Sequence, residues 1–118
     1  MRLPLQITAR DIELTEAIET AVRKKAEKLD QYSDRIMACR VVIECPHKHQ
    51  HKGVLYNVHI DLTLPGAELV VKREPNEDLY VALRDAFDAA GRQLREHIDR
   101  SNDHHGRNGA GEALAAEG

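Results

Sequence analysis

Apolar and polar residues alternate in four short stretches of the chain, and this alternation predicts four β-strands. The stretches cover residues 3–9, about 38–45, 54–64 and about 68–74. A period of two turns one side of each strand toward a core and the other toward solvent. Pro4 has no backbone N–H to donate, so we expect the first strand to lie at a sheet edge. Pro65-Gly66 indicates a tight turn between the last two strands.

Two other stretches have the apolar period of amphipathic helices. Thr15 is expected to cap the first helix, which runs to about residue 29, and Asn76 is expected to cap the second. The apolar positions are Ile18, Val22, Ala26 and Leu29 in the first helix and Leu79, Leu83, Phe87, Ala90, Leu94 and Ile98 in the second. No amphipathic pattern follows Ser101. We therefore interpret residues 1–100 as one domain and residues 101–118 as a disordered tail.

The predicted order of elements is β-α-β-β-β-α. A strand, a helix and a second strand in succession favour a parallel pair with a right-handed crossover, and the later strands favour an antiparallel meander. The expected fold is an α+β two-layer sandwich in which a four-stranded mixed sheet carries both helices on one face. A chain of 118 residues suits a single hydrophobic core.

The overall charge does not favour nucleic-acid binding. The formal net charge is −3 at pH 7, whereas nucleic-acid-binding domains are usually basic. Aromatic residues make up 3% of the chain, too few for a surface of several rings that would stack successive bases of a single strand. An RNA-binding function would therefore require cations that are collected on one face.

Projection of the helices shows such a collection of cations. Lys24, Lys25 and Lys28 share one flank of the first helix, and most of its acids lie on the opposite flank. The candidate phosphate-binding residues are Lys24, Lys25, Lys28, Lys72, Arg73, Arg84, Arg92 and Arg95. A solvated helix face with i,i+4 ion pairs would give a similar pattern, so the pattern alone leaves both interpretations open.

Several separated motifs over roughly residues 3–98 resemble those of the ribosome hibernation-promoting factors. This family is also called ribosome-associated inhibitor or sigma-54 modulation protein. The motifs are LTEAI at 14–18, KAEKLDQYSDRI at 25–36, PGAEL at 65–69, NEDLYVAL at 76–83 and RQLR at 92–95. Their order and spacing are similar to those of the short members, so the chain resembles the short type or a piece of a longer protein.

The resemblance implies a fold similar to double-stranded RNA-binding domains and a site on the small ribosomal subunit. It implies docking in the decoding cleft, over the tRNA positions and the mRNA path, with basic side chains on ribosomal RNA. Lys25 and Lys28 match the family's lysines on the first helix, and Arg92 and Arg95 match its basic positions on the second. Translation would be inhibited under stress or in stationary phase by steric occlusion, by a protein that is a monomer off the ribosome.

One departure from the family pattern lies on the second helix. Many members carry further lysines there, where this chain has Ala89 and Glu96. The positive face is therefore expected to be thinner in this chain, which affects the strength of binding more than its place. The alternative function is a protein-interaction regulator of the sigma-factor-modulation type that does not act through RNA.

The remaining candidate chemistry gives weaker signals. Cys45, His47, His49 and His51 alternate and could supply zinc ligands, but this segment is interpreted as a polar loop without a metal. Cys39 and Cys45 would lie roughly 20 Å apart on one strand, so they are expected to be free thiols.

No arrangement of catalytic side chains and no cofactor motif is visible, so the protein is not expected to be an enzyme or to bind a small-molecule substrate. The apolar runs are too short to span a membrane, and no signal peptide is recognisable. We therefore expect a cytoplasmic location without membrane contact.

Overall fold

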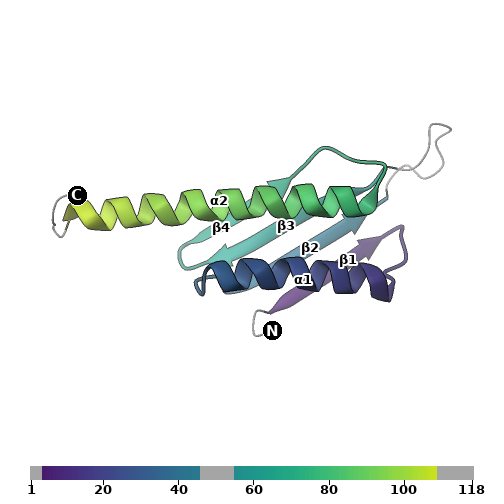
Figure 1. Ribbon diagram of the computed structural model, residues 1–118, viewed down its shortest axis with the longest axis horizontal. Coiled ribbons are helices and arrows are strands. Elements are labelled where there is room, and N and C mark those ends of the chain that lie inside the picture. The colour runs from purple at the N-terminus through teal and green to yellow at the C-terminus, as the bar shows by residue number, and fades with distance from the viewer. Residues whose placement is uncertain (1–3, 46–54, 109–118) are drawn as a thin grey trace.

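The predicted order of strands and helices is confirmed by the computed structural model, which describes residues 4–45 and 55–108 (Figure 1). The elements are β1 (Leu5–Arg10), α1 (Glu16–Tyr32), β2 (Ala38–Glu44), β3 (Asn57–Leu64), β4 (Ala67–Lys72) and α2 (Leu79–Asn108). Thr15 caps α1 as expected, because its hydroxyl oxygen accepts a hydrogen bond from the backbone N–H of Ile18.

The four strands form one mixed sheet in the order β1-β2-β3-β4. β1 and β2 are parallel, and β2, β3 and β4 pair in antiparallel fashion. The expected edge position of the first strand is thus confirmed. Both helices lie over the same face of the sheet, where α1 makes the crossover between β1 and β2 (Figure 1). The α+β two-layer sandwich follows from this arrangement.

The core between the helices and the sheet is aliphatic. Its fully buried large side chains include Val22 from α1, Val41 and Ile43 from β2, Ile60 and Leu62 from β3, Val71 from β4, and Leu83 and Leu94 from α2. Burial of each such side chain contributes about 1.5–3 kcal/mol. The predicted apolar positions of α1 are all buried, so the helical period identified its inward face correctly.

Both cysteines are buried free thiols, as expected. Burial, with a smaller contribution from the charge of Asp61, raises the pKa of Cys39 to about 12. The thiolate is the reactive form of cysteine, so Cys39 is an inert core residue at neutral pH.

The second helix begins at a different cap from the predicted one. Asp78 is the N-cap, since its Oδ1 accepts hydrogen bonds from the backbone N–H groups of Tyr80 and Val81 at 2.9 and 3.4 Å. Asn76 instead exchanges two backbone hydrogen bonds with Tyr56, at 2.8 and 3.1 Å. This bridge holds Asn76 beside the start of β3, so the helix starts two residues later.

The second helix also extends further than the sequence pattern suggested. It continues to Asn108, whereas we expected a disordered tail from Ser101. Residues 99–105 contain no proline or glycine, and extension of an existing helix costs much less than nucleation of a new one. Residues 109–118 lie outside the described residues, and the division into a domain and a tail stays a prediction.

Replacement of the observed cap should weaken the fold measurably. We expect Asp78→Ala to lower the free energy of unfolding by about 1 kcal/mol, because two N–H groups at the start of α2 lose their acceptor. Urea denaturation measures the change. The control is Glu77→Ala, which removes a neighbouring exposed acid and should have a smaller effect. An equal loss in both variants would contradict the assignment of the cap.

Candidate nucleic-acid interface

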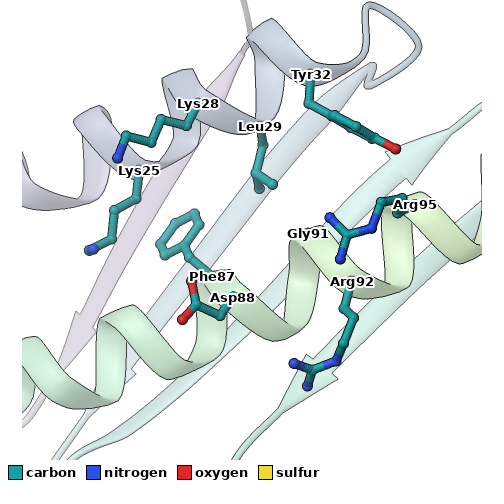
Figure 2. Close-up of a pocket in the computed structure, with 9 residues that line it drawn as sticks. All are labelled: Lys25, Lys28, Leu29, Tyr32, Phe87, Asp88, Gly91, Arg92 and Arg95. Carbon is teal, nitrogen blue, oxygen red and sulfur yellow. The ribbon is translucent and has the colours of Figure 1, made fainter.

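The two helices leave a groove of about 470 Å³ between them (Figure 2). Leu29 of α1 and Gly91 of α2 meet there, and a Cβ built on Gly91 would lie 3.7 Å from Cδ2 of Leu29. Such a distance is an ordinary van der Waals contact, so the two helices lie close together at this point. The volume of the groove lies in the range of ligand sites in proteins.

Four cationic side chains line this groove, two from each helix. Lys25 and Lys28 come from α1, and Arg92 and Arg95 come from α2. In the part of the chain that the structure describes, none of the four forms an ion pair or a side-chain hydrogen bond. The four charges are therefore available to an anionic ligand.

The ion pairs of the helices lie elsewhere. Arg23 donates to Glu19 one turn earlier on α1, at 2.7 Å, and the nearest approach of Arg84 to Asp85 is 3.5 Å. Surface pairs of this kind stabilise a helix by a few tenths of a kcal/mol. A helix face that is only solvated would be expected to carry i,i+4 ion pairs. Arg23 forms such a pair, whereas the two lysines of the groove do not.

Three further side chains complete the lining of the groove. Tyr32 is 48% exposed, although it is aromatic, and it lies at the same end of the groove as Arg95 (Figure 2). Phe87 is 6% exposed and presents its ring to the groove from α2. Asp88 lies among the cations, and within the described residues it has no hydrogen bond or ion pair.

The other predicted cations do not line this groove. Lys24 instead lines a shallow hollow that is formed by residues of α1, among them Glu16 and Thr20. Lys72 follows the buried Val71 in β4, so its side chain projects from the sheet face opposite the helices. Arg73 follows the end of β4, and Arg84 lies earlier on α2 beside Asp85. The structure therefore brings together half of the candidate set.

A charged network on the outer face of the sheet escaped the sequence analysis. Asp61 of β3 is 7% exposed and accepts a 2.7 Å hydrogen bond from Arg40 of β2. Nε2 of His59 lies 2.9 Å from the other carboxylate oxygen. Burial favours a higher pKa of Asp61, but the hydrogen bonds and charges of Arg40 and His59 outweigh it and lower the pKa.

No group of three or more potential metal ligands occurs within residues 4–45 and 55–100. His47, His49 and His51 lie outside the described residues, so the interpretation of their loop stays a prediction. Of the helices described, none combines the length and the apolar character that crossing a membrane requires.

The fold and the groove together define a class of protein: a small α+β domain whose paired helices present unpaired cations. Residues 5–102 match the family described as sigma 54 modulation protein / S30EA ribosomal protein. The chain belongs to this family, whose members are non-enzymatic ribosome hibernation factors. The resemblance drawn from the sequence motifs is thus confirmed.

Several ribosome hibernation factors are about one third identical to the chain over the aligned residues. The ribosome hibernation promoting factor of Escherichia coli (strain K12) is 32% identical over 102 residues, which cover 86% of this chain and 100% of that protein. The factor of Salmonella typhimurium is 31% identical with the same coverage. The ribosome hibernation promotion factor of Deinococcus radiodurans is 31% identical over 91 residues, which cover 77% of this chain and 47% of that longer protein.

Two solved structures share the fold. The N-terminal domain of Thermus thermophilus Protein Y has a TM-score of 0.66 and 30% identity, and the match covers 82% of this chain and 99% of that domain. A ribosomal subunit interface protein from Coxiella burnetii has a TM-score of 0.69 with the same coverage. Its identity of 16% makes it a likeness of fold alone.

The network around Asp61 predicts a loss of stability in acid. A carboxylate whose pKa is lower in the folded state stabilises the fold above its unfolded pKa, about 3.9, and this contribution disappears as the pH falls through the folded pKa. We expect Asp61→Asn to lower the free energy of unfolding by about 1 kcal/mol at pH 7, and the difference from the unmodified protein to shrink toward pH 3.

Urea denaturation at several pH values between 7 and 3 measures this difference. Asp85→Asn is the matched control, because Asp85 is more exposed and its contact with Arg84 is 3.5 Å long. Its effect should be small at every pH. A difference between Asp61→Asn and the unmodified protein that stays constant with pH would refute the role given to the charge of Asp61.

Proposed function

We propose that this protein binds the small ribosomal subunit through the groove between α1 and α2 and thereby silences translation. The observation that carries the proposal is the convergence of Lys25 and Lys28 with Arg92 and Arg95, all without acidic partners in the described structure. Ribosomal RNA offers a dense array of phosphates for such side chains. The names of the relatives, ribosome hibernation promoting factors, support the same target.

The proposed mechanism is steric occlusion of the decoding cleft. Phosphate contacts fix the position and orientation of a bound domain without reading sequence, which suits a protein that has only to fill a site. A folded domain held there excludes tRNA and mRNA, and no covalent bond is made or broken. A ribosomal target also places the proposed activity in the cytoplasm.

The net charge of −3 is compatible with this proposal. Some of the acids are already paired away from the groove. Glu19 forms an ion pair with Arg23 on another side of α1, and Asp61 forms one with Arg40 on the sheet. A small overall charge also gives a weak long-range field, so non-specific attraction to other RNA is limited. The cations of the groove then act at contact distance, where screening by salt is least complete.

The direct test reverses two charges of the groove. We expect Lys25→Glu combined with Lys28→Glu to lower the affinity for small subunits by about 100-fold or more, because two attractions to phosphate become repulsions. Comigration with small subunits in a sucrose gradient measures association. The unmodified protein should comigrate at low salt and dissociate as the salt concentration is raised.

The control variant is Lys72→Glu combined with Arg73→Glu, which changes the net charge by the same amount at the end of β4, outside the groove. It should retain most of the association. Circular dichroism verifies that both variants are folded. Unchanged comigration of the Lys25/Lys28 variant, or an equal loss in the Lys72/Arg73 variant, would overturn the assignment of the groove as the binding site.

A further inference from the structure

The cationic groove is bounded at one end by an acidic surface. Tyr32 borders a second hollow, whose charged lining consists of three acids and one base: Asp30, Asp34, Asp99 and Arg35. A phosphate backbone that follows Lys28 and Arg95 would meet a surface beyond Tyr32 on which the three carboxylates outnumber the single guanidinium of Arg35. Repulsion between like charges therefore ends the favourable path for phosphates at this residue.

Tyr32 presents an aromatic surface at this boundary. Its side chain is 48% exposed at the end of α1, and in Figure 2 the ring lies at the same end of the groove as Arg95 of α2. An exposed ring beside a cation is the arrangement on which an unstacked RNA base can lie. A single ring cannot hold a succession of bases, but it can hold the base at the end of a short segment.

Asp88 adds a constraint inside the groove. It is exposed, it has no partner among the described residues, and it lies among the four cations (Figure 2). A carboxylate repels a phosphate, so the backbone is favoured along the rims, near the lysines of α1 or the arginines of α2. A base that turns inward can instead donate an N–H to this carboxylate.

We infer that the groove takes a short unpaired segment of RNA, whose last base stacks on the ring of Tyr32, in preference to a continuous duplex. This inference rests on the proposed function and specifies the form of RNA at the same site. In the interior of a duplex the base faces are covered by their neighbours and the pairing edges are occupied, so neither Tyr32 nor Asp88 gains a contact there.

The test compares binding of single-stranded and duplex RNA. Fluorescence anisotropy at low salt measures the affinity of the full chain for a labelled six-nucleotide single strand and for a longer, stable duplex that contains the same sequence away from its ends. We expect the single strand to bind more tightly. Tyr32→Ala should weaken its binding by about tenfold, because one base loses its stacking surface. Binding of the duplex should not change.

Tyr32→Phe is the matched control, since it keeps the ring and removes only the hydroxyl. It should bind the single strand within about twofold of the unmodified protein. Equal affinity for the two RNAs, no measurable binding of either, or an unchanged affinity of Tyr32→Ala would each overturn the inference.

The sucrose-gradient experiment separates this inference from the proposed function. One outcome is that the Lys25/Lys28 variant fails to comigrate with small subunits while Tyr32→Ala binds single-stranded RNA as tightly as the unmodified protein does. In that case the groove binds the ribosome, but Tyr32 does not select the form of the RNA. If the unmodified protein does not comigrate with small subunits, the proposed function fails. The oligonucleotide measurements then still decide whether the groove prefers unpaired RNA.

Discussion

The packing of α1 beside α2 on one face of the sheet is the contact on which the candidate site depends. A crossover between parallel strands is right-handed, and this rule fixes the sheet face that α1 covers. α2 returns to the same face after the meander, and Leu29 meets Gly91 between the helices. Residues 25–28 thereby lie beside residues 92–95, although most of the chain separates them. The topology therefore places the two helices so that a groove forms between them, and the cations that line the groove suit it to an anionic ligand.

The availability of charge in the groove matters more than the net charge of the protein. Lys25 and Lys28 have no acidic residue three or four positions away on α1, so the helix itself offers them no partner. The arginines of α2 do have acids at such distances, yet they too are unpaired in the structure. Only the lack of a partner on the same helix could be inferred from spacing, and only for the lysines. The side-chain directions on α2 had to be observed.

Features that depend on local sequence could be predicted, whereas features that depend on contacts between distant elements could not. The apolar periods of two and 3.6 residues predicted the strands and helices, their order and the residues that face the core, because burial of one face imposes those periods directly. The cap of α2 depends on a bridge between Asn76 and Tyr56, and the network of Asp61 depends on strand register, so neither has a local signal. Projection of α1 could not separate Lys24 from Lys25, because it contains no information about where α2 lies.

The two faces of the molecule use their charges differently, and this difference bears on function. On the outer face of the sheet, Asp61 holds Arg40 and His59 within 2.9 Å, so cation and anion satisfy one another inside the protein. In the groove, the cations of both helices and Asp88 remain without partners in the described structure. Unpaired groups of both signs at one place suit a ligand that carries both anionic and hydrogen-bond-donating groups. RNA with accessible bases has both, whereas a simple polyanion would satisfy only the cations.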